Sequence, residues 1–269
     1  MKPKPTTHSK PSTILILTIL AITITIASFL LKTKNTTSSN EIIKNKMEQS
    51  QDSSSSSTSA SEIIESKLTL SSSIQSTLDY YQCTSSSSSL PSVQVVLLHG
   101  AAFTKQDWFD SGILQKLCKE LPSVTALDLT VKATSQDFVQ VYQSLVKEGV
   151  LKDEPIVVIS PSASGKAIVD LASMFINSDN TFAPFLKAWV PVACPAVGDA
   201  SQSTLTAFAS LDIPILAVYG DEDVSGKKRT EPLVTYAKAK EQMLKGRHPV
   251  YLDSPMELVE VFLNFVKSL

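Results

Sequence analysis

The chain has 269 residues, of which 43% are hydrophobic, so it is long enough for one catalytic-size domain with additional segments. Its 24 lysines and arginines nearly balance its 26 aspartates and glutamates, which argues against a dedicated nucleic-acid binder and against a highly charged disordered chain. The three cysteines exclude a disulfide-dense scaffold, and any mechanism that needs an imidazole has only three histidines available: His8, His99 and His248.

The N-terminal segments precede the expected fold. Residues 1–13 are polar, and residues 14–31 form an uncharged apolar run that as a helix would be about 27 Å long, close to the roughly 30 Å hydrocarbon core of a bilayer. This run predicts an uncleaved signal anchor and a single-pass membrane protein in contact with lipid. A cleaved signal peptide is the alternative, but its apolar region is normally only about 7–15 residues. Lysines on both sides leave the orientation open, and the serine-rich residues 32–61 predict a flexible tether.

Residues 62–269 show the pattern of an α/β domain. Three strands separated by serine turns come first, at 68–70, 78–83 and 93–98, with the serine run 85–89 as a hairpin loop. Further strands are expected at 124–129, 156–160, 188–193 and 213–219, and helices at 107–121, 135–149, 163–176 and 255–269. Leading antiparallel strands followed by strand–helix alternation predict a mostly parallel central sheet with an antiparallel N-terminal hairpin and helices on both faces.

The segment with the clearest chemical signal is 155–165, which reads PIVVISPSASG and predicts a strand, a tight turn and a helix. In the nucleophile elbow of α/β-hydrolases, Gly-x-Ser-x-Gly, the central serine stands on such a strained turn. Here Ser160 and Ser164 occupy the two glycine positions and Ser162 is central, so Ser162 is the candidate nucleophile. A chance serine string is the alternative in so serine-rich a chain, but the strand before it and the helix after it favour the elbow.

A serine nucleophile needs a base that is itself oriented by a third group. The elbow fold predicts the chain order Ser, Asp or Glu, His, and His248 is the only histidine after Ser162. A surface histidine is the alternative interpretation. The acid is expected after the strand 213–219, where the usual spacing of three residues from the glycine selects Asp223, with Asp221 as the fallback and a solvated acidic turn as the alternative.

A strand that ends in His99-Gly100 predicts one side of an oxyanion hole. The backbone N–H groups of Ala101 and Ala163 are the expected donors, and His99 is expected to orient the loop rather than act as a base. No His or Cys pair has metal-ligand spacing and no glycine-rich phosphate loop is present, so neither a metal nor a required cofactor is expected. The stretch 194–212 is too short for a large lid, which predicts an open site.

Residues 62–269 resemble the α/β-hydrolase domain-containing protein 14 family. The matching blocks are Leu97-Leu-His-Gly100 with Phe103 and Trp108, the Ser-Pro-Ser-x-Ser-Gly elbow, Val190-Pro-Val-Ala193, Val218-Tyr-Gly-Asp-x-Asp223 and His248-Pro-x-Tyr-Leu-Asp253. The resemblance implies an α/β-hydrolase fold and a serine hydrolase with its triad on Ser162, Asp223 and His248. It further implies acyl groups on small molecules or protein side chains as substrates, including deacylation of protein lysines, with coenzyme A as an acyl acceptor.

Three departures from the family pattern concern substrate contacts. The turn at 130–133 is Thr-Val-Lys-Ala, where the family usually has Pro-Gly-x-Gly; Ala102 stands where the family often has arginine; and the turn 245–247 is one residue short. The sequence therefore predicts a serine hydrolase that acts on acyl esters or amides, or transfers the acyl group. The alternative is a catalytically silent binding module of the same fold, tethered to a membrane.

Overall fold

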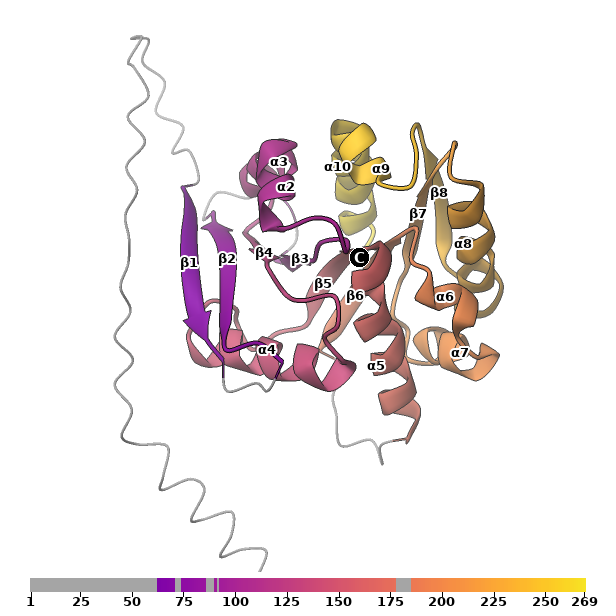
Figure 1. The fold of residues 1–269 in the computed structure, drawn as a ribbon, viewed down its shortest axis with the longest axis horizontal. Helices are drawn as coiled ribbons and strands as arrows, with labels where there is room; N and C mark the ends of the chain where they lie inside the picture. Colours follow the sequence, from indigo (N-terminus) through magenta and orange to yellow (C-terminus); the bar gives the residue numbers. More distant parts are fainter. Residues whose placement is uncertain (1–61, 71–73, 86–89, 91, 178–184) are drawn as a thin grey trace, which may run out of the picture. The chain divides into compact units, whose positions relative to one another are not determined.

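A computed structural model describes residues 62–70, 74–85, 90, 92–177 and 185–269. These residues form an eight-stranded sheet with the order β1-β2-β4-β3-β5-β6-β7-β8 (Figure 1). The strands are β1 (Ile63–Thr69), β2 (Thr77–Thr84), β3 (Gln94–Leu97), β4 (Ser123–Leu127), β5 (Ile156–Pro161), β6 (Leu186–Val192), β7 (Leu216–Gly220) and β8 (Lys240–Leu244). β2 is antiparallel to β1 and β4, and the other pairs are parallel. The predicted mostly parallel sheet with an antiparallel N-terminal pair is confirmed.

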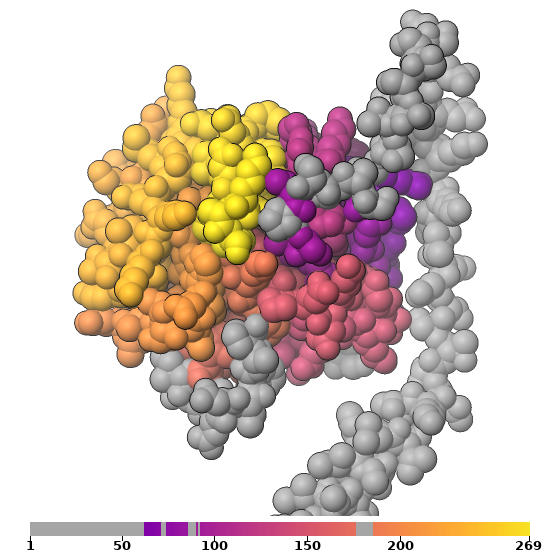
Figure 2. Space-filling model, turned by 180° about the vertical axis from the view of Figure 1, so that it is seen from behind, coloured from indigo at the N-terminus to yellow at the C-terminus, as the bar shows by residue number. Residues whose placement is uncertain are grey.

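Helices cover both faces of this sheet (Figure 1). One layer consists of α4 (Ser135–Lys147), α5 (Gly165–Asn177), α6 (Ala196–Asp199), α7 (Gln202–Ser210) and α8 (Val224–Ala237). The other consists of α2 (Lys105–Asp110), α3 (Ile113–Glu120), α9 (Val250–Asp253) and α10 (Pro255–Val266). Figure 2, from the opposite side, shows the yellow C-terminal segment beside the magenta segment that contains α3.

The central strands are apolar on both faces because both faces are covered. On β5, Ile156 and Val158 pack into the core under α4, α5 and α7, whereas Val157 and Ile159 pack into the core under α3 and α10. Successive side chains of a strand point to opposite faces, so a continuous apolar run is what a doubly covered strand requires. The continuous apolar run at 156–160 is therefore what a strand inside a doubly covered sheet requires.

Two local predictions differ from the structure. The single helix expected at 107–121 is two helices, α2 and α3, because the chain turns at Gly112, whose φ is 78°. The serine run 85–89 does not close a hairpin between β2 and β3, because β2 pairs with β4 and β3 lies between β4 and β5. Residues 86–89 themselves lie outside the described residues.

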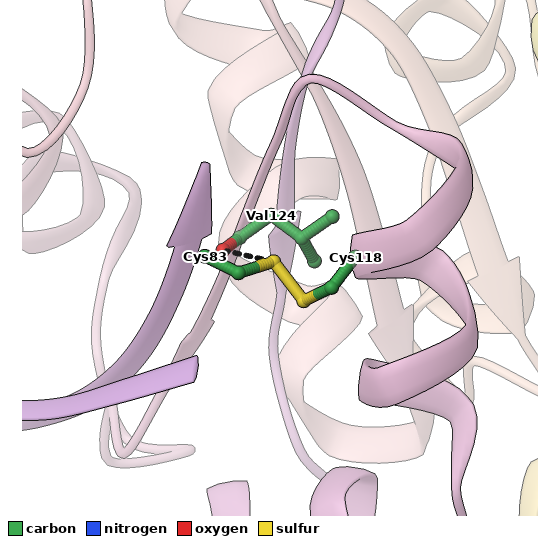
Figure 3. The surroundings of a disulfide bond; sticks show 3 residues. All are labelled: Cys83, Cys118 and Val124. Atoms are coloured by element: carbon green, nitrogen blue, oxygen red, sulfur yellow. Dashed lines mark hydrogen bonds between the residues drawn. A yellow bond between two sulfur atoms is a disulfide. The ribbon is translucent and has the colours of Figure 1, made fainter. Parts of the chain in front are cut away.

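A disulfide joins the antiparallel edge of the sheet to a helix (Figure 3). It links Cys83 at the end of β2 to Cys118 on α3, over a sequence separation of 35 residues, and both cysteines are buried. The spacing of the cysteines in the sequence did not reveal this pair. The third cysteine, Cys194, is a buried free thiol.

The membrane localisation expected from the sequence is contradicted by the structure. In the part of the chain that the structure describes, no helix is both long enough and apolar enough to cross a bilayer. Among the described residues, the longest helix is α8 with 14 residues, whereas a span takes about 20. The segments 1–13, 14–31 and 32–61, on which the expected anchor and tether fall, lie outside the described residues.

The connection between β6 and β7 carries no large insertion. All of its residues are described, and they form only α6 and α7. In an open α/β sheet, ligands bind at the carboxyl ends of the strands. The connection between β6 and β7 therefore adds no large lid over the carboxyl end of β5.

Candidate active site

The turn after β5 holds Ser162 in a left-handed backbone conformation, with φ at 51°. Such a φ is costly for a residue with a side chain and is typical of a nucleophile held on a sharp turn between a strand and a helix. The flanking serines have defined partners. Ser160 Oγ accepts a hydrogen bond from the Trp189 indole at 2.7 Å, and the Ser164 hydroxyl donates to the Pro161 carbonyl at 2.9 Å. The two serines that replace the usual glycines therefore each have a hydrogen-bond partner for the hydroxyl group.

The glycine that follows the turn is required by packing. A Cβ on Gly165 would lie 2.3 Å from Cys194 Sγ, which is well inside contact distance. Cys194 itself is buried, and burial raises the pKa of its thiol to about 12. At neutral pH this cysteine is a protonated packing group and not a second nucleophile.

The structure brings the three candidate catalytic side chains together. His248 Nδ1 lies 2.6 Å from Asp223 Oδ2, and His248 Nε2 lies 2.9 Å from Ser162 Oγ. With Nδ1–H donating to the carboxylate, Nε2 is left as the acceptor for the Ser162 hydroxyl. The imidazole is thus in position to take a proton from the serine.

Asp223 is tied to the start of α8 as its N-cap. Its Oδ1 accepts the backbone N–H of Gly226 at 2.8 Å and the Ser225 hydroxyl at 2.8 Å, while Oδ2 faces His248. Burial acts to raise the pKa of the carboxyl, but the hydrogen bonds from Gly226, His248 and Ser225 outweigh it and hold that pKa below its usual value. The group is therefore a carboxylate at neutral pH.

The fallback acid, Asp221, has a different partner. Its Oδ1 accepts the N–H of Gly246 at 2.8 Å, two residues before His248, so it anchors the histidine loop and not the imidazole. The same loop is fixed from the other side by Arg247, whose Nη2 lies 2.7 Å and whose Nε lies 3.1 Å from the Asp253 carboxylate. The two supporting roles, of Asp221 and Asp253, were not predicted from the sequence.

The loop after β3 is held through the Gly100 carbonyl. This oxygen accepts the N–H of Phe103 at 3.1 Å and lies 2.9 Å from His99 Nδ1. Because the C=O and N–H of one trans peptide point in opposite directions, fixing the Gly100 carbonyl also fixes the direction of the Ala101 N–H. Ala101 is exposed and Ala163 is half-buried, so neither of the residues that carry the expected donors is fully buried.

Behind His99 lies a charged cluster that sequence reasoning missed. Asp128 Oδ1 accepts the N–H of Lys105 at 2.6 Å and lies 3.8 Å from His99 Nε2. The Lys105 ammonium, almost fully buried, pairs with Glu65 at 3.0 Å and with Asp128 at 3.4 Å, and it lies over the Tyr81 ring. Burial acts to lower the pKa of Lys105, but Glu65 and Asp128 raise it above its usual value. The loop thus has a rigid support.

Within the described residues, no group of three or more His, Cys, Asp or Glu side chains is placed to hold a metal ion. The chemistry that this arrangement can perform is nucleophilic. A serine on a strained elbow has a hydrogen-bonded base, and the base has a carboxylate behind it.

Enzymes that carry this strand–turn–helix elbow on a mostly parallel sheet form one class. The chain is accordingly a serine hydrolase of the α/β-hydrolase type. Comparisons with known proteins agree with the class. No protein-family model matches the chain. A CIB-like hydrolase from Thermoplasma acidophilum shares the fold, with a TM-score of 0.54 at 16% identity over 78% of this chain and 100% of that one.

Sequence relatives identify the family. ABHD14B, named as a candidate protein-lysine deacylase, is 28% identical in Homo sapiens and 30% identical in Pongo abelii, over 190 residues that cover 65% of this chain and 83% of the relative. ABHD14A of Danio rerio is 30% identical over 189 residues, 67% of this chain and 66% of the relative. The chain belongs to the ABHD14 family of α/β-hydrolases.

Proposed function

We propose that the chain cleaves acyl esters or amides through an acyl-enzyme on Ser162, with residues 62–269 as the catalytic domain. His248 acts as the base and Asp223 orients it. The observation that carries the proposal is the unbroken run of hydrogen bonds from the Ser162 hydroxyl through both nitrogens of His248 to the Asp223 carboxylate. A structural serine would have no need of a base oriented in this way.

In the proposed reaction, Ser162 Oγ attacks the acyl carbonyl while its proton passes to His248 Nε2. The N–H groups of Ala101 and Ala163 stabilise the negative charge that develops on the carbonyl oxygen, and one such donor is typically worth about 3–4 kcal/mol. The intermediate then collapses, the alcohol or amine leaves with the proton from His248, and the acyl group stays on Ser162. Water, activated by the same imidazole, releases the acid and regenerates the serine.

The substrate class we propose is an acyl group on a protein lysine. Support comes from the relative ABHD14B, named as a candidate protein-lysine deacylase, and from the short β6–β7 connection, which leaves room for a protruding side chain. Small acyl esters fit the same chemistry. The acyl-enzyme can pass its acyl group to water or to a thiol such as coenzyme A, and product analysis with and without coenzyme A separates the two.

The test is labelling of the full-length chain with a fluorophosphonate probe, together with turnover of p-nitrophenyl acetate. Wild-type protein should be labelled and should turn over ester, whereas Ser162→Ala should lose both while remaining folded. Ser210→Ala is the matched control, because Ser210 is an exposed serine on α7 whose hydroxyl donates to the Thr206 carbonyl at 3.2 Å. Labelling that survives Ser162→Ala would overturn the assignment, and folded wild-type protein without turnover would favour the silent binding module.

A further inference from the structure

Tyr251 is a buried aromatic residue on α9, three residues after His248. Its ring lies 4.8 Å from the Trp108 ring and meets Phe103 edge-on at 5.8 Å between ring centroids. These contacts join the histidine loop to the loop that follows β3. They account for an aromatic ring at this position, but a phenylalanine would make them equally well.

The hydroxyl of Tyr251 is unusual in this molecule. The residue is 1% exposed, and its oxygen makes no hydrogen bond that meets full geometric criteria with any described residue. Burial of an unpaired hydroxyl destabilises a fold, because the group loses its hydrogen bonds to water. Folding alone would therefore favour phenylalanine here. By comparison, the buried Tyr142 on α4 donates its hydroxyl to the Glu154 carbonyl at 3.2 Å.

The backbone N–H of Gly100 is near enough to the Tyr251 hydroxyl to act on its pKa. Burial, with the charge of Asp107, raises the pKa of the hydroxyl above its usual range, and the Gly100 amide opposes this only in part. The group is a neutral phenol at neutral pH, whose oxygen is free to accept a hydrogen bond. Among the described residues, the Gly100 N–H donates to no backbone carbonyl. Within the described ranges, the buried Tyr251 hydroxyl therefore has no hydrogen-bond partner and the buried Gly100 N–H has no backbone acceptor.

A hydrogen bond between these two groups would hold Gly100, whose carbonyl shares a peptide with the N–H of Ala101, the expected oxyanion donor. The Gly100 carbonyl is already held by Phe103 N–H and His99, so the Gly100 N–H is the remaining polar group that can fix the residue. Catalytic hydrogen bonds are often long before substrate binds and shorten in the complex.

We propose that Tyr251 is a positioning residue for the oxyanion hole. Its hydroxyl accepts the Gly100 N–H as the transition state forms and holds the Ala101 N–H on the developing negative charge. Since Tyr251 lies three residues after His248, one short segment would position both the base and the oxyanion donor. The inference rests on the proposed function, because it assigns a role in the same acyl transfer.

The test compares wild type, Tyr251→Phe, Tyr142→Phe and Ser162→Ala as full-length chains. For each, kcat and KM for p-nitrophenyl acetate, the inhibition constant of an alkyl boronic acid and the melting temperature are measured. The boronic acid forms a tetrahedral adduct with a serine, so its affinity reports on transition-state contacts.

Tyr251→Phe should lower kcat about tenfold and leave KM unchanged, because only a transition-state contact is lost. Boronic acid affinity should fall by a similar factor, and the melting temperature should stay the same or rise. Tyr142→Phe should show the opposite pattern, a lower melting temperature with unchanged kcat.

Unchanged kcat and boronic acid affinity in Tyr251→Phe would overturn the inference, as would a loss of kcat in proportion to a loss of folded protein. Wild-type turnover that persists in Ser162→Ala would instead overturn the proposed function. The two failures are therefore distinguishable.

Discussion

Glycine is used where the backbone of the site leaves no room for a side chain. A Cβ on Gly220 would lie 2.2 Å from the Gly246 carbonyl oxygen, and a Cβ on Gly226 would lie 2.4 Å from Asp223 Oδ2. At the elbow itself, serines stand in for glycines because Trp189 and the Pro161 carbonyl satisfy their hydroxyls. A chain with only eight glycines can in this way build a strained hydrolase site.

The two aspartates after β7 should differ sharply in activity assays. Asp223→Asn should lower kcat by about 10⁴-fold, because an amide no longer holds the imidazole in the tautomer that accepts the serine proton. Asp221→Asn should lower kcat by less than about tenfold, because the side-chain oxygen of the asparagine can still accept the Gly246 N–H. Both variants are assayed for p-nitrophenyl acetate turnover, with circular dichroism to establish folding. Equal losses, or a larger loss in Asp221→Asn, would contradict this assignment.

At the scale of elements, α8 and β8 show why some helices and strands were not predicted from the sequence. The buried positions of α8 are Gly226, Thr230, Leu233 and Ala237, which have helical spacing but little apolar character. Its outer face is charged, and Pro232 lies within it. β8 is an edge strand with only Leu244 buried. Hydrophobic periodicity finds elements that bury large side chains, so both of these were missed.

The disulfide between β2 and α3 should contribute strongly to stability. Cross-linking residues 35 apart removes loop entropy from the unfolded chain, worth about 4 kcal/mol at 25 °C. Cys118→Ser should therefore lower the free energy of unfolding in urea by about that amount, and a reductant should destabilise the wild type but not this variant. A thiol titration of the unfolded, unreduced wild type should find one free thiol, from Cys194, and a count of three would exclude the bond.

At the scale of the whole molecule, the short connection between β6 and β7 bears on substrate choice. Its residues form only α6 and α7, so this connection supplies no apolar cover for a long acyl chain. We expect kcat/KM to be higher for p-nitrophenyl acetate than for p-nitrophenyl palmitate. We also expect no jump in rate when the substrate forms micelles. Preference for the long chain, measured under matched detergent conditions, would contradict this expectation.

Much of the architecture could be predicted because its signals are local. The apolar run at 156–160 corresponds to β5, and the amphipathic pattern at 135–149 corresponds to α4. Strand order was less accessible, because β2 pairs with β4 across β3 in the chain, and no local pattern encodes that pairing. The apolar run at 14–31 gave a membrane localisation that the described structure contradicts. The hydropathy pattern alone was therefore not enough to predict the localisation of the protein.

The sequence by itself determined the candidate groups and their order: Ser162 in a strand–turn–helix context, acidic residues after a later strand, and His248 as the one histidine beyond the serine. Tertiary structure decided the partners. It placed Asp223 against His248 and Asp221 against Gly246, joined Cys83 to Cys118, and brought Tyr251 to the Gly100 amide. The physical reason is that residue type and spacing fix local conformation, whereas contacts between distant segments depend on how the sheet and its helices pack.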